Sequence, residues 1–403
     1  MKHFYHFSHG DLDGIMCHAI TSYVLYNLAD QNYFETIEEV NFIEVPNPNN
    51  LADTILNVTV DGNELGSLMN IAHRLDKEDE LYIIITDLSM NYNVYDYLKD
   101  VSKKRNVNLI YVDHHESTYE FEEKEKSKGN WIITDKEFIN PSSASWLYYS
   151  YLFGIIPSSV CEIKPFLGSS IENKLDKCHG IGLISKIVSM YDTFRFKKES
   201  MFNVTIDTEI GKTELKLPEL LNSAFYLEEN FASRRRFLLN IVNFVQSLEE
   251  SKQLANPNMI QVKYDETQVI LTKTLFQGEL EKDYYKKIKF IKDYFMDNRM
   301  RLITFEGYQC GICLGCPNEY FNEVAYQALT TYFKDKIDIV MNINLDKASV
   351  GLRSAEDSDV NVAKIAEYYE GGGHAHAAGF PVNLHRKEEF IIGYANAGII
   401  RIH

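Results

Sequence analysis

The sequence is poor in features that define specialised protein classes. Its six cysteines are few and unevenly placed for 403 residues, which excludes a small disulfide-stapled scaffold. Because no secretory signal opens the chain, a reducing cytoplasm is the expected location. Strongly apolar runs such as Leu81–Thr86 are far shorter than the roughly 20 residues of a membrane span. No membrane partner is therefore expected.

Basic residues are scarce as well. The chain has 41 Lys and Arg residues against 58 Asp and Glu residues, a formal charge of -17, and it lacks an extended basic tract. Such a field repels a long phosphate backbone unless metal ions or a local basic patch reverse its sign. Long duplex nucleic acid is therefore not an expected partner.

In other respects the composition is typical of a globular protein, with 45% hydrophobic and 25% charged residues. Its length predicts two or three domains at roughly 150 residues each. In the first 195 residues, β-rich runs alternate with helical patterns, which favours a parallel α/β sheet covered on both faces. The predicted strands are His3–Ser8, Phe42–Val45, Leu81–Thr86 and Leu109–Val112, and the predicted helices are Ile15–Leu28, Leu65–Leu75 and Val94–Lys104.

The rest of the chain divides into a connector and a second α/β region. The connector combines a β-like stretch, Asn203–Leu217, with a helical stretch, Glu228–Leu254. We predict a catalytic domain over 1–196, a helical connector over 197–264 and a smaller α/β domain over 265–403. In the last domain, the predicted strands are Gln268–Thr272, Leu302–Phe305, Ile337–Ile343 and Ala348–Leu352, and the predicted helices are Phe321–Phe333 and Val362–Tyr369.

The first cluster of polar residues follows the first predicted strand, in the segment from Ser8 to Gly14. In an extended backbone, side chains two and four residues apart project to one side, so His9, Asp11 and Asp13 are expected to converge. Three such side chains at a strand end are typical of a cation site. Taken alone, the segment is better explained as an Asp-rich turn in which Asp13 caps a helix.

Other polar groups follow neighbouring strands in the same way. Asp87 follows Leu81–Thr86, the triplet 113–115 (Asp113, His114, His115) follows Leu109–Val112, and Asp192 ends a helical stretch. Because parallel strands end at one edge of a sheet, these groups are expected to share a crevice. Mixed His and Asp ligands favour Mn²⁺ over Ca²⁺, and there are enough for two ions about 3.5–4 Å apart, as in phosphate-ester hydrolases.

Together these residues resemble the four motifs of the DHH phosphoesterase superfamily, in their usual order. A glycine-rich C-terminal segment, 371–380, resembles the DHH-associated substrate-binding domain, as does Gly351-Leu352-Arg353-Ser354. The resemblance covers both ends of the chain, and the layout is most similar to the nanoRNase or oligoribonuclease branch. One departure is that His9 lies two residues before Asp11, whereas several branches have a gap of four.

The resemblance implies a role for each matched residue. One Mn²⁺ ion would be held by His9, Asp11 and Asp87, and the other by Asp13, Asp87, His114 and Asp192, so that Asp87 bridges the two. Mg²⁺ or Co²⁺ are possible substitutes. His115 would face the scissile phosphate, and Asp113 would orient the histidines. Substrate binding would fall to Arg353, Ser354, Gly371, Gly372, Gly373 and His374.

Chemistry supports the C-terminal assignment. A glycine run lets backbone N–H groups approach a phosphate, and Arg353 is suited to bidentate phosphate contact. The alternatives are a plain glycine turn with a solvated His374, or a dinucleotide fingerprint. The fingerprint is disfavoured because the run follows a helical pattern and too little chain remains for a βαβ unit.

Two further patterns favour structural explanations. Cys310, Cys313 and Cys316 have no fourth ligand nearby, so small buried side chains are favoured over a metal site. Residues 234–236, all arginine, could attract an RNA tail. On a helix they spread around the axis, however, so a solvated face is favoured.

The resulting hypothesis is an Mn²⁺-dependent phosphodiesterase that hydrolyses short oligoribonucleotides to mononucleotides, with a homodimer possible. Rival substrates are linear or cyclic dinucleotide signals and 3′-phosphoadenosine 5′-phosphate. Long single-stranded DNA, the substrate of RecJ-type relatives, is less favoured because no extended basic tract is present. A non-catalytic nucleotide sensor and a pyrophosphatase are weaker alternatives.

Overall fold

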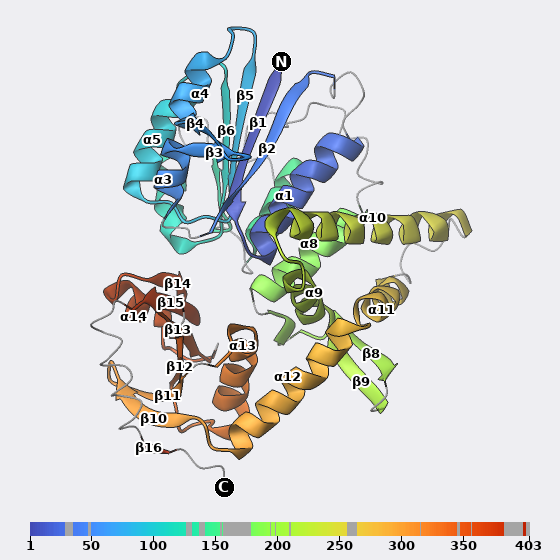
Figure 1. Ribbon diagram of the computed structural model, residues 1–403, viewed down its shortest axis with the longest axis vertical. Helices are drawn as coiled ribbons and strands as arrows, with labels where there is room; N and C mark the ends of the chain where they lie inside the picture. The colour runs from blue at the N-terminus through green and yellow to red at the C-terminus, as the bar shows by residue number, and fades with distance from the viewer. Residues whose placement is uncertain are drawn as a thin grey trace. The chain divides into compact units, whose positions relative to one another are not determined.

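The structure is a computed structural model, and it divides into two compact units, Met1–Leu280 and Glu281–His403. Both are α/β, which confirms the predicted fold class (Figure 1). The residues that the structure describes are 1–28, 35–46, 50–125, 131–136, 142–153, 155, 179–193, 195–197, 199–208, 211–255, 264–314, 316–344, 347–355, 357–382 and 398–399.

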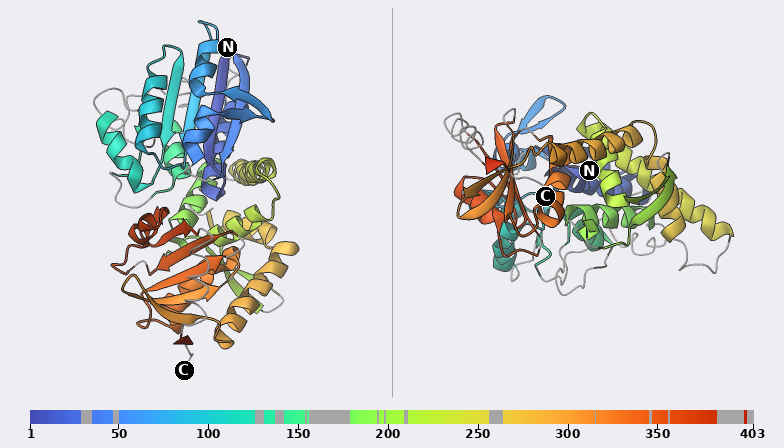
Figure 2. Two further views of the ribbon diagram at one scale, coloured as in Figure 1. Left: turned by 60° about the vertical axis from the view of Figure 1, so that its left-hand side comes forward. Right: turned by 90° about the horizontal axis from the view of Figure 1, so that it is seen from below.

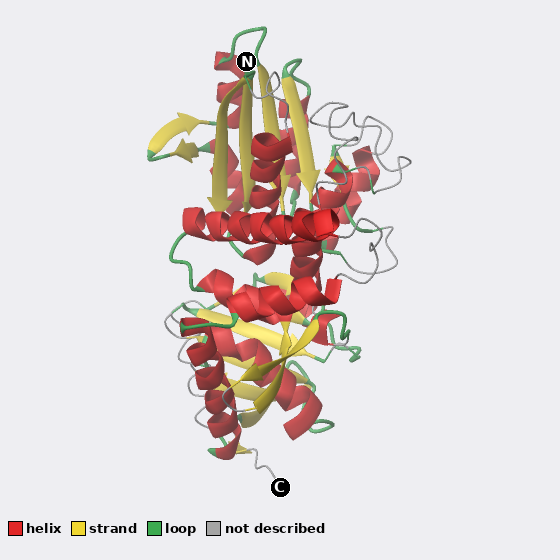
Figure 3. Cartoon of the chain, turned by 90° about the vertical axis from the view of Figure 1, so that its right-hand side faces the viewer, coloured by secondary structure: helices red, strands yellow, loops and turns green. Residues whose placement is uncertain are grey.

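A five-stranded parallel sheet forms the centre of the first unit. Its strands, in spatial order, are β2 (Ile37–Val45), β1 (Lys2–His9), β5 (Glu80–Thr86), β6 (Val107–Val112) and β7 (Ile132–Ile133). The main strands all run in one direction (Figure 3). The chain moves outward to β2 on one side of β1 and to β5 and β6 on the other. Such a reversal opens a crevice at the carboxyl ends of the two central strands, here β1 and β5.

Helices cover both faces of this sheet, because the strands are apolar on both sides. One face buries Phe7, Ile83 and Tyr111 against the helices on that side. The other face lies against α1 and α7, and α8 packs on these two helices. The elements between the strands are α1 (Leu12–Tyr23), the π-helical turn η1 (Val24–Leu28), α3 (Leu51–Leu56), the hairpin β3 (Val58–Val60) and β4 (Asn63–Gly66), α4 (Leu68–Arg74), α5 (Tyr92–Ser102), η3 (Glu116–Thr118), α6 (Tyr119–Glu125), α7 (Ala144–Leu152) and α8 (His179–Asp192).

The predicted connector packs with the first unit. Its long helix α10 lies against α1 and α8, and α9 lies against α8. The packing units therefore divide the chain differently from the three predicted segments, whose status as functional domains stays a prediction. The elements are η5 (Arg195–Lys197), the hairpin β8 (Asn203–Thr208) and β9 (Gly211–Lys216), α9 (Leu217–Tyr226), α10 (Phe231–Ala255) and α11 (Tyr264–Leu275).

A seven-stranded mixed sheet forms the second unit, with helices on both faces (Figure 2). Residues of α12 and α13 pack on one face, and residues of α14 pack on the other. In spatial order the strands are β14 (Gly372–His374), β15 (Ala377–Pro381), β13 (Ser349–Ser354), β12 (Ile339–Asn344), β11 (Tyr308–Leu314), β10 (Arg301–Phe305) and β16 (Gly398–Ile399). The helices are α12 (Glu279–Met296), α13 (Asn318–Gln327), the π-helical turn η6 (Ala328–Tyr332) and α14 (Val362–Tyr368).

Most predicted elements are present, but the strand predicted over Gln268–Thr272 is wrong. The segment is part of helix α11. Its β-branched residues favour a strand locally, yet Thr267, Leu271 and Leu275 are buried at a spacing of four residues, which is the period of a helix face. Tertiary burial therefore decides against local propensity.

A smaller difference concerns the start of one helix. The helix predicted over Leu65–Leu75 begins only at Leu68, because Leu65 and Gly66 belong to strand β4. Within the described residues, no helix combines the length and apolar character that a bilayer span needs.

Candidate metal centre

Eight of the predicted site residues lie at the carboxyl edge of the first sheet, where the central strands end. His9 is the last residue of β1, and Asp11 and Asp13 follow at the start of α1. Asp87 directly follows β5, Asp113 and the two histidines directly follow β6, and Asp192 is the last residue of α8. The topology thus brings together residues that are far apart in the sequence.

The first group consists of His9, Asp11 and Asp87, whose ligand atoms lie within 4.8 Å of one another. His9 Nδ1 lies 2.9 Å from Asp11 Oδ2 and 3.9 Å from Asp87 Oδ2. The short gap between His9 and Asp11 in the sequence therefore still brings the two side chains together. Asp87 has a positive φ of 55°, a conformation that Asp tolerates better than most residues.

A second group consists of Asp13, His114 and Asp192, with ligand atoms again within 4.8 Å. His114 Nε2 lies 3.5 Å from Asp192 Oδ2 and 3.3 Å from Asp87 Oδ1. The expectation of an extended segment through Asp13 is wrong. The chain turns into α1 at Leu12, which places Asp13 in the first helical turn and in this second group.

The predicted capping residue is also different. Asp11, in extended conformation, is the N-cap of α1, and its Oδ1 accepts a hydrogen bond from the Gly14 N–H at 3.0 Å. Asp13 is instead held by the start of α7. The N–H groups of Ala144 and Ser145 donate to it at 2.8 and 3.2 Å, and the Ser145 hydroxyl donates as well.

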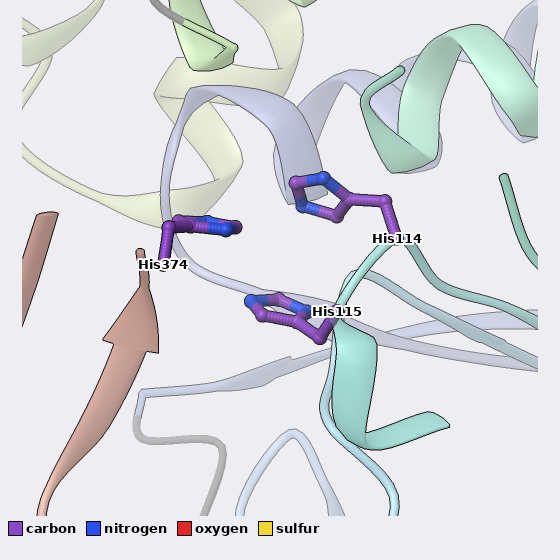
Figure 4. A group of neighbouring side chains, drawn as sticks. All are labelled: His114, His115 and His374. Carbon is purple, nitrogen blue, oxygen red and sulfur yellow. The ribbon is translucent and has the colours of Figure 1, made fainter. Parts of the chain in front are cut away.

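A third group consists of Asp87, Asp113 and His115. His115 Nδ1 lies 2.6 Å from Asp113 Oδ1, and the Thr118 hydroxyl donates to the other oxygen of Asp113. Figure 4 shows the His114 and His115 rings extending to the same side of the loop after β6, with ring centroids 4.7 Å apart. Asp113 thus holds His115 through Nδ1 of its ring.

The electrostatics of the cluster are those of crowded, buried acids. Burial and the nearby carboxylate of Asp11 raise the pKa of Asp87 well above its ordinary range. Burial likewise raises the pKa of Asp192 to about 8, although His114 opposes the shift. Burial lowers the pKa of His9, but Asp11 and Asp87 outweigh it and raise the value to about 10. The cluster therefore needs protons or cations to be stable.

Two buried carboxylate oxygens fit a cation better than a proton network. Asp87 Oδ2 and Asp192 Oδ2 are buried and have no hydrogen-bond partner within the described part of the chain. An uncompensated buried carboxylate oxygen is costly, and coordination to a metal ion satisfies it. With imidazole and carboxylate donors in each of the first two groups, the residues fit Mn²⁺ or a related transition ion.

Sequence reasoning missed the groups that hold the ligands in place. Ala144, Ser145 and Thr118 act by hydrogen bonds to Asp13 and Asp113. Ser145 is more than 130 residues from Asp13 in the chain. No sequence motif marks it, since it lies at the start of a helix far from the four motifs.

In the second unit, the sheet places Arg353 and His374 on either side of one small residue. Both pair with Ala377, Arg353 from β13 and His374 from β14. Paired residues on antiparallel strands share a face, so the two side chains flank Ala377 about 10 Å apart. Arg353 is held by Asn322 at 2.9 Å and lies over the Phe321 ring. Gly372 lies two residues before His374 on β14, and a Cβ atom added to it would meet open space.

Ser354 is not brought together with Arg353. As the next residue in β13, it points to the opposite face, where its hydroxyl donates to the Val360 carbonyl oxygen at 2.9 Å and lies 3.0 Å from His376 Nδ1. It is 6% exposed. Nothing in this placement supports a contact of Ser354 with a ligand of Arg353.

The three cysteines lie in the two cores of the second unit. Cys310 packs on one face of the sheet, whereas Cys313 and Cys316 pack in the cluster on the other face. All three are buried. Because β11 separates Cys310 from the other two, the structure supports small buried side chains here.

Comparison with known proteins gives structural matches only. No family model and no curated protein matches the sequence. An uncharacterized protein from Helicobacter pylori G27 matches at 17% identity and a TM-score of 0.37, over 98% of this chain and 100% of the other. A pGpG-specific phosphodiesterase, PggH from Vibrio cholerae, matches at 14% identity and 0.38, over 96% and 97%.

Exonuclease RecJ bound to manganese matches at 13% identity and a TM-score of 0.42, over 97% of this chain and 89% of the other. At these identities and TM-scores, the matches report a likeness, and function has to be argued from the site itself.

Proposed function

We propose that this protein is a DHH-type, Mn²⁺-dependent phosphodiesterase that hydrolyses short oligoribonucleotides to mononucleotides. The observation that carries the proposal is the shared position of Asp87. It belongs to the groups with His9 and Asp11 and with Asp113 and His115, and its Oδ1 lies 3.3 Å from His114 of the remaining group. A carboxylate that joins neighbouring ligand sets is what a two-metal site requires.

The ligand sets follow from these groups. His9, Asp11 and Asp87 would hold one ion. The group of Asp13, His114 and Asp192 would hold the other together with Asp87, whose Oδ1 lies 3.3 Å from His114 Nε2. When bound, two such ions lower the pKa of a water molecule and neutralise charge on the phosphate. The N–H groups at the start of α7 fix Asp13, and the Gly14 N–H fixes Asp11, so the protein sets the ligand positions in advance.

His115 is the residue that we assign to the phosphate. Burial raises the pKa of Asp113, but the adjacent His115 and His114 outweigh it and lower the value below its ordinary range. The ionised carboxylate therefore accepts from Nδ1 of His115 at 2.6 Å. Nε2 is the ring atom that we assign to donate a hydrogen bond to a phosphate oxygen or a proton to the leaving group.

Charge argues for a short substrate. The formal charge of -17 repels a long polyanion, whereas metal ions at the buried acids create a local site for one or two phosphates. Arg353 and His374 in the second unit are proposed to bind substrate as well. A cytoplasmic location and a homodimer stay predictions.

The first test is Asp87→Asn in the purified protein. We expect Mn²⁺-dependent hydrolysis to fall by about 100-fold or more, beyond the range typical of residues that only support a ligand. Calorimetric titration with Mn²⁺ should lose one or both ions. Asp100→Asn, which removes an exposed carboxylate of the same unit that pairs with Lys103, is the matched control and should retain both.

The substrate is tested with a panel that compares RNA dinucleotides, five-residue and longer RNAs, cyclic dinucleotides, 3′-phosphoadenosine 5′-phosphate and pyrophosphate. The proposal expects the highest kcat/KM on the shortest linear RNAs. A preference for a cyclic dinucleotide, 3′-phosphoadenosine 5′-phosphate or pyrophosphate would replace the proposed substrate. Stoichiometric nucleotide binding without turnover would indicate a sensor.

A further inference from the structure

An exposed tyrosine lies beside the metal centre, at the end of helix α9. Asn222 of α9 donates a hydrogen bond to the Tyr191 hydroxyl at 2.9 Å, and Tyr191 directly precedes Asp192. Tyr226 lies four residues after Asn222 and therefore on the same side of α9. The residue is 50% exposed. Burial of the remainder and the charges of Asp11 and Asp192 raise the pKa of Tyr226, as expected for a phenol close to the acidic cluster.

Arg234, at the start of α10, lies against this tyrosine. Its guanidinium carbon is 5.0 Å from the centroid of the Tyr226 ring and 5.3 Å from that of Phe225. Nε donates to the Glu228 carbonyl oxygen at 3.2 Å, which fixes the direction of the side chain. Among the described residues, no carboxylate lies within ion-pair distance of Arg234, and neither Nη atom has an acceptor.

The two neighbouring arginines are placed differently. Arg235 turns toward the first sheet, where its guanidinium carbon lies 3.9 Å from the centre of the Phe42 ring. Arg236 is exposed. The three arginines therefore do not form one basic face, as expected from their spread around the helix axis. Arg234, however, is a cation without an ion-pair partner among the described residues, and it lies next to the acidic cluster.

We propose that Tyr226 and Arg234 form a nucleotide subsite in the first unit. Tyr226 stacks on a base of the substrate, and Arg234 binds the phosphate adjacent to the one that is hydrolysed. The inference rests on the proposed function, because it names the part of the substrate recognised beside the metal centre.

The chemistry of the two side chains fits this assignment. An exposed aromatic ring stacks on any base, so it gives affinity without sequence preference. A guanidinium group binds a phosphate through two parallel hydrogen bonds, and Arg234 has both Nη groups for that purpose. A single stack and one additional phosphate contact define a substrate of about two nucleotides, which needs no extended basic tract.

The test for Tyr226 uses a 5′-phosphorylated RNA dinucleotide and its analogues in which one base is absent. Tyr226→Ala should raise KM for the intact dinucleotide by about 5- to 150-fold, the range for loss of one base–aromatic stack. On the analogue that lacks the stacked base, the same substitution should change KM by less than about twofold. Tyr226→Phe keeps the ring and should keep the KM of the wild type.

For Arg234, the corresponding pair of substrates is the dinucleotide with and without its 5′-phosphate. Arg234→Met should raise KM for the phosphorylated form by about tenfold or more and have little effect on the other. The matched controls are Arg236→Met on the same helix and Tyr92→Ala, which removes a tyrosine that is 56% exposed on α5. Neither should change KM.

Failure of this subsite is distinguishable from failure of the proposed function. A dinucleotide carrying 2-aminopurine can be titrated into each variant, and its fluorescence reports stacking without turnover. Suppose that the wild type hydrolyses no substrate but quenches 2-aminopurine fluorescence, and that Tyr226→Ala fails to quench it. The subsite is then supported, and the proposed reaction is wrong. Equal KM or binding in wild type, Tyr226→Ala and Arg234→Met, with thermal unfolding unchanged, would overturn the subsite.

Discussion

At the scale of single residues, two buried histidines lie beneath the metal centre. His6 and His18 are fully buried, with ring centroids 4.3 Å apart. The Thr86 hydroxyl donates to Ser8, so it accepts from Nε2 of His6 at 2.9 Å, and Thr21 donates to Nδ1 at 3.0 Å. His6 is therefore held as one neutral tautomer. Neither ring nitrogen of His18 has a partner in hydrogen-bond geometry within the described residues, although the nearby His6 backbone opposes the fall of the His18 pKa.

This difference predicts a stabilising substitution, His18→Phe. The His18 ring lies edge-on to Phe42 and Phe231, so a phenyl ring suits the site and removes two unsatisfied atoms. We expect the free energy of unfolding at neutral pH to rise by about 1–3 kcal/mol. Urea unfolding of the variant and the wild type measures this difference, and a loss of stability would contradict it.

The same variant should change the pH dependence of stability. Burial and then Arg235 lower the pKa of His18 well below 6.5, so below that pH the unfolded state binds a proton that the folded state does not. The stability of the wild type should therefore fall as the pH falls through 6.5, and His18→Phe should reduce that slope by up to about 1.4 kcal/mol per pH unit. Parallel slopes from pH about 7.5 to 5.5 would refute this assignment.

At the scale of elements, the three consecutive glycines 371–373 at the start of β14 differ in the space around a Cβ atom and in backbone conformation. A Cβ at Gly371 would lie 2.1 Å from the Gly379 carbonyl oxygen, and Gly373 has a φ of 137°. At Gly372, by contrast, nothing lies within 4 Å of a Cβ and φ is not positive. The backbone here therefore requires glycine at positions 371 and 373, whereas it does not require glycine at position 372.

These situations predict opposite outcomes for two alanine substitutions. Gly371→Ala should lower the free energy of unfolding of the second unit by about 1–3 kcal/mol, because backbone atoms cannot move away. Gly372→Ala should leave it within about 0.5 kcal/mol, while KM for the substrate rises if the backbone here approaches a phosphate. Thermal unfolding and KM measured on both variants test the two statements. Equal stability losses would contradict the first, and an unchanged KM for Gly372→Ala would contradict the second.

At the scale of the whole molecule, five buried or half-buried aspartates lie together where metal ions would bind. In the folded protein without metal, Asp192 keeps its proton up to a pH of about 8 and His9 up to about 10, well above their ordinary values of 3.8 and 6.5. The folded state therefore binds more protons than the unfolded state between pH 3.8 and about 8 through Asp192, and between pH 6.5 and about 10 through His9. The stability of the folded state falls as the pH rises through these two ranges.

Metal ions must displace these protons, so their stabilising effect should grow with pH. At about 100 times its Kd, Mn²⁺ stabilises the folded state by about 2.7 kcal/mol. With a fixed Mn²⁺ concentration, the rise in thermal midpoint should be larger at pH about 8 than at about 6.5. Differential scanning calorimetry measures it, and Asp87→Asn should reduce it. An equal rise at both values would contradict the displacement of protons.

The sequence by itself determined the α/β class, the strands of the first sheet and the positions of the polar residues that follow them. Local pattern is sufficient for these, because apolar runs of strand length and the residues after them are neighbours in the chain. It could not determine that Asp13 lies in the helix rather than in the extended segment, or that residues 264–275 are helical.

Only the tertiary structure decided which acids share a group and what holds them. Ser145 with Asp13, Thr118 with Asp113, and Tyr226 with Arg234 are contacts made by packing between elements. The structure also shows that Ser354 and Arg353 point to opposite faces of β13, and that Cys310 and Cys313 lie in cores on opposite faces of the sheet. The physical reason is clearest for Ser145 and Asp13, whose contact depends on packing between segments 132 residues apart, which no local pattern encodes.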